Sequence, residues 1–573
     1  MEISPPAGKT ELLFFEPRPT QVQMLHGSWI DVRPMASLET SGPLNFRLPA
    51  STDTLIDLSR SFLYLRCRIL LKDGNLAVKA KPTDQRLAEL KKASTDATAK
   101  KGVAETTLIT AQRNQTTQGA ALKVADDKLR TAEAAEATST SVAPTASDAT
   151  AAVVVQLLAT QDTAAGSKQA ADTGVAVAQK ALTAATQEET VAQDEYATAS
   201  SLSVARDTNH LVAPVANFLH SLFSNVDVSL NGRSIVSSSG NYAYKSYIST
   251  LLSASRDAID SQYQSALFYP DDPKEFEINT RGFQTNKGLM KRYEASKGSK
   301  EFEVMDTLNI DLANQEKLLI PGINLTLTLR RNDPKFCLMS WEEGVEYRVD
   351  ITEAVFYVRQ VEVASSFLVE TERRLLTETA KYYFQRLEVN VLPLNVMSTV
   401  INEANLSVAS PALPNRIVVA IVETESQLGA YHRNPFFFSL AGLSSISFVF
   451  NGQSMPYRMI PFNVDNTRET VSSTWLMGYY SLFAQTGMLG HPLGSSHIGR
   501  EDWLHGYSLI AFDFTPDGSL GEHLQISRGG VLNLEMRFSR PLPTSYSVIM
   551  LSAYDSYLQI SSDRSVFANF TLG

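Results

Sequence analysis

The stretch NVDVSLNGRS, residues 225–234, alternates apolar and polar residues and then reaches an Asn-Gly pair. The stretch SISFVFNGQS, residues 445–454, repeats this pattern later in the chain. Alternation with a period of two is typical of a half-buried β-strand, and Asn-Gly suits a two-residue hairpin turn. The sequence therefore predicts two equivalent structural turns, at Asn231, Gly232, Asn451 and Gly452.

The repeat continues beyond these hairpins. A Tyr-rich helical segment follows each copy, and further strand pairs match in the same order at an offset of about 200 to 220 residues, which is the size of a domain. Strand-Asn-Gly-strand patterns are common in β-proteins, so that each match alone is weak. The matched segments are 242–252 with 474–483, 308–312 with 511–514 (which makes Asp311 equivalent to Asp513), 325–330 with 532–537, and 347–363 with 546–560.

Repeated short strands with helices at selected joints predict a mainly β chain made of two tandem jelly rolls. The predicted parts are an extended N-terminal arm at 1–40, a first jelly roll at 41–364, a linking helix at 365–380 and a second jelly roll at 381–573. The arm is compatible with packing on a neighbouring subunit or with disorder.

Residues 85–205 interrupt the first roll with a different composition, in which Ala and Thr supply about four residues in ten. Seven-residue steps of small residues run through both halves of this segment, which predicts a long antiparallel helical hairpin with a left-handed supercoil. A low-complexity linker is the alternative, since Thr is a poor helix former. The predicted packing positions are Ala97, Ala104, Ala111, Ala164, Ala171, Ala178, Ala185 and Ala192.

Composition excludes several classes of protein. The 573 residues carry a formal net charge of −10, which disfavours a chain whose surface is devoted to nucleic acid, and no specific nucleic-acid sequence is expected as a partner. No segment approaches the roughly 20 apolar residues of a transmembrane helix. Residues 1–30 lack the features of a secretory signal.

No enzyme is predicted, because phosphate-binding, Gly-x-Ser-x-Gly and zinc-protease motifs are absent from the sequence. Three histidines, His491, His497 and His505, lie near Glu501 and Asp502, but their spacing matches no standard zinc pattern, and an ordinary loop is favoured. Cys67 and Cys337 occupy apolar contexts typical of buried thiols. Arg330, Arg331 and Lys335 form a basic cluster suited to ion pairs or an interface. No cofactor or metal is expected.

Five segments resemble the major capsid proteins of Polinton/Maverick elements and adintovirus-like DNA viruses, and the resemblance covers nearly all of the chain outside 85–205. These segments are 213–232, 242–252, 315–323, 335–339 and 500–508.

The resemblance implies a double jelly-roll capsid subunit. Its homotrimer would form a pseudo-hexagonal capsomer in the icosahedral shell of a virion, around double-stranded DNA and assembled inside the host cell. Expected partners are further copies of the chain, penton and minor capsid proteins, and a host receptor reached through 85–205. That insertion departs from the family pattern, and an outward spike is favoured over an inward one. A trimeric receptor-binding or lectin-like jelly-roll protein with a coiled-coil hairpin is the alternative.

Overall fold

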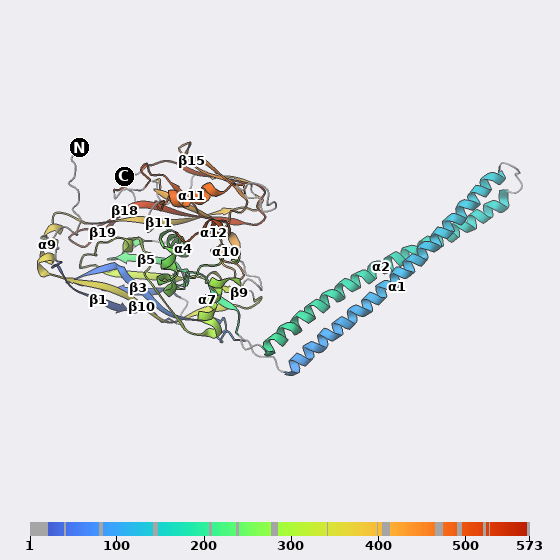
Figure 1. Cartoon of the computed structure of the whole chain (residues 1–573), viewed down its shortest axis with the longest axis horizontal. Helices are drawn as coiled ribbons and strands as arrows, with labels where there is room; N and C mark the ends of the chain where they lie inside the picture. The colour runs from blue at the N-terminus through green and yellow to red at the C-terminus, as the bar shows by residue number, and fades with distance from the viewer. Residues whose placement is uncertain are drawn as a thin grey trace. The chain divides into compact units, whose positions relative to one another are not determined.

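The structure is a computed structural model that describes residues 21–38, 42–78, 84–140, 147–204, 209–236, 240–276, 285–340, 342–397, 399–403, 413–463, 474–489, 496–518, 523–526 and 528–569. The chain divides into two compact units. One joins Met1–Ala77 to His210–Gly573 and contains the β-sheets, and the other, Val78–Asn209, is the helical insertion (Figure 1). The predicted arm up to residue 20 and the residues 141–146, between the two halves of the predicted hairpin, lie outside the described residues.

The first roll contains two four-stranded antiparallel sheets and, beside them, a two-stranded sheet of β4 (Val212–Pro214) and β9 (Leu338–Ser340). One has the strand order β1 (Met24–Val32), β10 (Tyr347–Val363), β3 (Thr54–Leu71) and β7 (Phe302–Asp306). The other has the order β2 (Leu44–Leu48), β8 (Leu325–Arg331), β5 (Phe223–Leu230) and β6 (Arg233–Val236). Inward residues alternate with outward ones along β5 and β8, as their sequences predict.

The second roll repeats this arrangement strand for strand. Its first sheet has the order β11 (Ala380–Leu394), β18 (Tyr546–Ile560), β13 (Arg416–Glu423) and β16 (Ile510–Asp513), with β19 (Val566–Asn569) added beside β18. Its second sheet has the order β12 (Val400–Glu403), β17 (Leu532–Phe538), β14 (Leu443–Phe450) and β15 (Gln453–Pro461). The predicted double jelly roll is confirmed.

Two sequence assignments differ from the structure. Met24–Val32, which was expected within an extended arm, forms the edge strand β1, because its backbone pairs with β10 from Val32 back to Met24. The segment 308–312, which was expected to match 511–514, is not a strand, since it runs into the 3-10 helix η4 (Asp311–Asn314). The true equivalent of β16 is β7, so the residue that matches Asp513 at the strand end is Asp306 rather than Asp311.

Helices join the two rolls into one body. The helix α4 (Tyr242–Ser253) follows the first Asn-Gly hairpin, and α11 (Leu476–Ala484) follows the second. The helix α9 (Ser365–Leu375) lies within the segment 365–380 expected as a linking helix but ends before it does, because Ala380 already belongs to β11. Buried residues from both rolls belong to one continuous hydrophobic cluster, so the rolls share a core.

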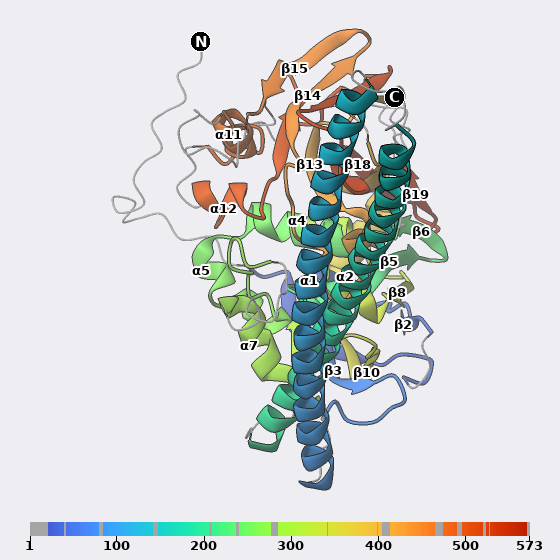
Figure 2. The ribbon, with the colours of Figure 1, turned by 90° about the vertical axis from the view of Figure 1, so that its right-hand side faces the viewer.

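The insertion consists of two helices, α1 (Asp84–Thr140) and α2 (Ser147–Val204). Figures 1 and 2 both show them side by side in opposite directions, with extensive contact between them. The predicted helical hairpin is confirmed. At 1.5 Å per residue, each helix is about 85 Å long.

Candidate functional site

The two Asn-Gly turns have the same backbone geometry. Asn231 and Gly232 have φ angles of 48° and 80°, and Asn451 and Gly452 have φ angles of 48° and 84°. Positive φ at both central residues is the signature of the hairpin turn that matches strand twist, and Asn and Gly are the residues that adopt it most readily. The four predicted turn residues therefore lie in the positions that connect β5 to β6 and β14 to β15.

The asparagines of these turns also make matching hydrogen bonds to the residue directly before the neighbouring strand, β8 or β17. The backbone amide of Asn231 donates to the backbone carbonyl of Asn324 at 2.9 Å, and the backbone amide of Asn324 donates back to Asn231 Oδ1 at 2.8 Å. In the second roll, the backbone amide of Asn451 donates to the Val531 carbonyl at 3.0 Å, and the backbone amide of Val531 donates to Asn451 Oδ1 at 2.9 Å. Each turn thus fixes the start of β8 or β17 as well as its own hairpin.

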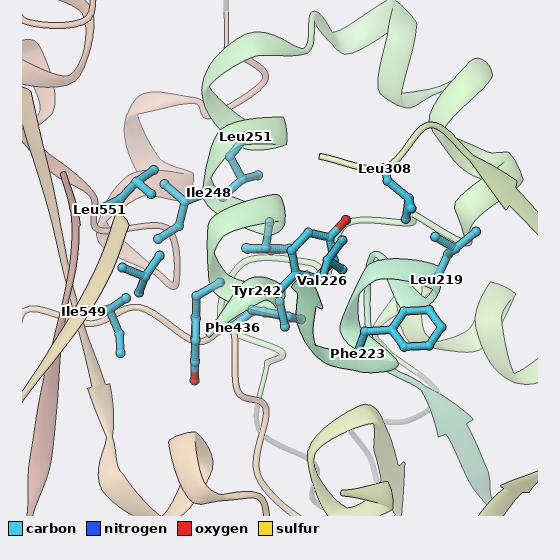
Figure 3. Packing of buried hydrophobic residues seen from close by; sticks show 14 of the residues in the cluster. Leu219, Phe223, Val226, Tyr242, Ile248, Leu251, Leu308, Phe436, Ile549 and Leu551 are labelled. Carbon is cyan, nitrogen blue, oxygen red and sulfur yellow. The ribbon is translucent and has the colours of Figure 1, made fainter. Parts of the chain in front are cut away.

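The helix α4 packs between the rolls. Ile248 on α4 lies beside Leu551 on β18, and both side chains are buried (Figure 3). On the same helix the ring of Tyr247 stacks on that of Phe436, with centroids 4.0 Å apart and planes 10° from parallel. Because Leu551 and Phe436 belong to the second roll, this helix of the first roll covers a face of the second roll's sheet.

A fully buried ion pair lies at the same junction. Arg292 Nη2 is 2.6 Å from Asp271 Oδ1, and neither side chain is exposed to solvent. Asn286 Nδ2 donates to Asp271 Oδ1, and Asn434 Nδ2 donates to Asp271 Oδ2, each at 2.9 Å. The Tyr507 hydroxyl donates to the Asp271 backbone carbonyl at 2.8 Å. Since Asn434 and Tyr507 belong to the second roll, Asp271 connects the two rolls through polar contacts as well as apolar ones.

A second buried pair has the same bridging role. Lys245 Nζ on α4 is 2.6 Å from Asp311 Oδ1, with 4% and 1% of the two side chains exposed. The other carboxylate oxygen of Asp311 accepts a hydrogen bond at 3.2 Å from the backbone amide of Leu387, which lies on β11 of the second roll. A buried charge is tolerated only when it is paired and hydrogen-bonded, so the position of β11 is coupled to that of α4.

In the hairpin, the least exposed residues follow two seven-residue steps along each helix. Ala97 and Ala178 are buried, with 4% and 6% of their surface exposed. The other predicted packing residues are half-buried, and they are Ala104, Ala111, Ala164, Ala171, Ala185 and Ala192. Small side chains at these positions let the two helices approach closely.

Polar pairs set the register of the two helices. Lys101 Nζ is 2.8 Å from Glu189 Oε2 on the facing helix, and Lys100 Nζ is 2.6 Å from Glu188 Oε1. Further along, Gln115 Nε2 donates to Asp172 at 2.9 Å. All three contacts can form together only when the two helices run antiparallel in this register.

The described histidines, acids and cysteines that the sequence singled out do not gather into one metal-binding cluster. His497 lies in a partly buried loop beside Tyr507, and burial lowers its pKa to about 4, while His491 lies outside the described residues. Cys67 and Cys337 are free and fully buried, and burial raises the pKa of the Cys67 thiol to about 12. Among the described residues, no group of three or more His, Cys, Asp or Glu side chains could hold a metal ion.

The basic cluster is distributed among separate partners. Arg330 Nε is 3.7 Å from Asp227, Arg331 Nη2 donates to the Leu38 carbonyl at 2.9 Å, and Lys335 Nζ is 3.3 Å from Glu346. These three residues serve local ion pairs and hydrogen bonds. None of the described helices is long and apolar enough to cross a bilayer.

The strand order of both rolls and their shared core define a double jelly-roll protein. No known family model matches the chain. An uncharacterized protein of Caenorhabditis elegans is 21% identical over 336 residues, which span 58% of this chain and 75% of that protein.

Solved structures give a second comparison. A chain in the cryo-EM structure of the Sputnik virophage has a TM-score of 0.51 and 9% identity, with 100% of this chain and 94% of that chain covered. The mavirus major capsid protein has a TM-score of 0.43 and 8% identity, with 100% and 96% covered, a likeness too weak to support a conclusion. The similarity to the Sputnik chain supports the fold described above.

Proposed function

We propose that this chain is a major capsid protein, with a structural rather than a catalytic role, located in a virion. The observation that carries the proposal is the duplication: two rolls of identical strand order occur in one chain and share one core. The sequence resemblance to Polinton/Maverick and adintovirus-like capsid proteins and the likeness in fold to a chain of a virophage particle support it.

The duplication suits a pseudo-hexagonal capsomer. Three copies of a chain with two similar rolls present six similar outer edges around one axis, and closed cyclic symmetry is the usual form of a homo-oligomer. Such a capsomer tiles a hexagonal lattice, which an icosahedral shell around double-stranded DNA requires over its faces. Buried ion pairs such as Arg292–Asp271 hold the two rolls in a fixed relation, as a rigid tile needs.

The helical hairpin is proposed as a spike on each capsomer, available to a host receptor. Its exposed faces carry few large apolar side chains apart from scattered valines, one isoleucine and one leucine, and its ion pairs are internal. Penton and minor capsid proteins are the further partners that a closed shell of hexagonal tiles needs.

The experiment is negative-stain electron microscopy of the purified chain, together with its mass in solution. We expect particles with a six-sided outline and a mass three times the chain mass of 62.9 kDa. Monomers, or stalked trimers without a six-sided outline, would contradict the proposal. Stalked trimers are the result expected of a receptor-binding or lectin-like protein.

A further inference from the structure

A cleft of about 490 Å³ lies next to the helix α12 (Arg500–Leu504), and residues of the second roll line it together with Lys274 and Phe276 of the first. Its floor is apolar and buried, and it is formed by Phe276, Leu440, Leu443 and Phe462. This volume is within the range of ligand-binding pockets in proteins. The cleft can therefore accept several large apolar side chains.

The rim of this cleft is positively charged. Lys274 and Arg540 line it and are exposed, and no carboxylate is among the described residues that line it. Neither cation forms an ion pair with another described residue. An apolar floor with cations on its rim is complementary to an apolar peptide that carries carboxylates.

The chain contains a segment with that chemistry in Glu11-Leu12-Leu13-Phe14-Phe15-Glu16. Four large apolar residues are consecutive, and a glutamate stands at each end. Water solvates such a run poorly, while the two carboxylates fit the two rim cations. Prolines at positions 17 and 19 favour an extended backbone directly after it.

The described chain nearest to this segment lies at the other end of the rolls from the cleft. The strand β1 begins at Met24, beside Val363 and the start of α9. Figure 1 shows α9 at one end of the rolls and α12 at the other. Ser439 lines the cleft, and its backbone amide donates a hydrogen bond to the backbone carbonyl of Ile421. Ile421 on β13 and Leu392 on β11 both pair with Val548 on β18, so the cleft lies near the Leu392 end of β11.

Between Ala380, which follows α9, and Leu392, β11 runs about 40 Å at 3.3 Å per residue. The chain from Phe14 to Met24 reaches about 35 Å at most when fully extended, and a path over the surface is longer than a straight line. This comparison favours a segment supplied by another copy.

We propose that the cleft binds segment Glu11–Glu16 of a second copy of this chain. The inference rests on the self-assembly proposed above and identifies one contact by which copies hold each other. It predicts that the apolar side chains enter the cleft and that the two glutamates face Lys274 and Arg540.

The main test is photo-cross-linking in the full chain with Phe14→p-benzoylphenylalanine. This chain is co-expressed with a differently tagged copy that lacks the photo-reactive residue, and the copies are purified together and irradiated. We expect cross-links from position 14 to residues 437–443 or 504–505 of the other copy, identified by mass spectrometry. Cross-links confined to one copy, or to other surfaces, would overturn the inference.

A charge exchange adds specificity. Lys274→Glu with Arg540→Glu should weaken binding of a fluorescent peptide of residues 8–20 at least tenfold, and a peptide with Glu11→Lys and Glu16→Lys should restore it. Lys300→Glu, an exposed lysine outside the cleft, is the matched control and should have no effect. Equal loss in the control, or no rescue, would contradict the assignment.

The peptide also separates this inference from the proposed function. If the chain stays monomeric but binds the peptide in the cleft, capsomer assembly fails and recognition of the segment stands. If the chain forms six-sided trimers and the peptide does not bind, the proposed function stands and this inference fails.

Discussion

Asn231 Nδ2 donates a hydrogen bond of 2.9 Å to the backbone carbonyl of Arg564, so the hairpin turn of the first roll is tied to the last strand pair of the second. Arg564 in turn donates from Nε to the Pro321 carbonyl at 2.8 Å and pairs with Glu372 on the linking helix. One residue near the end of the chain therefore contacts the first roll, the linker and its own roll.

The aspartate variant of Asn231 isolates this contact. Asn231→Asp keeps the oxygen that accepts from Asn324 and removes the amide donor, so the free energy of unfolding should fall by about 1 kcal/mol. Urea denaturation measures it. Asn451→Asp is the matched control, because no bond from Asn451 Nδ2 to the other roll is found in the described part of the chain. Equal effects in both variants would contradict the bridging role.

The buried pair at the junction should matter more than any surface pair. Arg292→Met leaves Asp271 charged and without its cation, so we expect a loss of about 3 to 5 kcal/mol in the free energy of unfolding. Arg330→Met removes a surface partner of Asp227. The Arg330 side chain is 65% exposed, so this change should have little measurable effect on the free energy of unfolding. Similar losses in both variants would show that Arg292 does not stabilise the junction.

The insertion should be removable without loss of the rolls. The His210 amide donates to the Ala77 carbonyl at 3.0 Å, so the two ends of the segment 78–209 meet and a short linker can join them. A chain in which Gly-Ser-Gly replaces this segment should keep its melting temperature and the number of copies in its oligomer. Aggregation or loss of β circular dichroism would show that the rolls need the hairpin.

The hairpin should weaken in acid. A hydrogen bond from Lys101 lowers the pKa of Glu189 below its ordinary value. Its contribution to stability is therefore present above the pKa of an unfolded glutamate, about 4.3, and is lost as pH falls through the lower folded pKa. Hydrogen exchange of residues 84–204 should accelerate over that range, and Glu189→Gln should reduce the pH dependence. An unchanged dependence in the variant would exclude this pair as its source.

The two thiols should be silent in the native protein. Burial raises the pKa of Cys67 to about 12 and raises that of Cys337 as well, so hardly any thiolate is present at pH 8, and neither sulfur is exposed. Iodoacetamide should modify neither residue before unfolding and both in urea. Rapid labelling of the native chain would contradict the burial of these two thiols.

The parts of the fold that depend on local pattern could be predicted from the sequence. The Ala steps of the hairpin recur every seven residues, and the Asn-Gly pairs each follow an alternating strand, so short-range spacing carries both signals. The error at 308–312 arose because alternation there suggested a strand, whereas hydrogen bonding places the strand at Phe302–Asp306. Pairing partners decide such cases, and no local pattern contains them.

The polar junction could not be predicted in the same way. Asp271, Arg292 and Asn434 are far apart in the sequence, and each has an ordinary polar context there. Only the packing of one roll on the other removes them from water together. That the Arg292 side chain is fully buried can be seen only in the folded structure, because nothing in the sequence around Arg292 indicates it.

The single core that spans both rolls limits how this protein can evolve. A duplicated domain often remains a module that recombination can exchange between related genes. Here α4 of the first roll and the sheet of the second are complementary halves, so a chimera that inherits one roll from a distant relative would bring together surfaces that never adapted to each other. The hairpin, whose ends meet at Ala77 and His210, is the segment that lineages can replace.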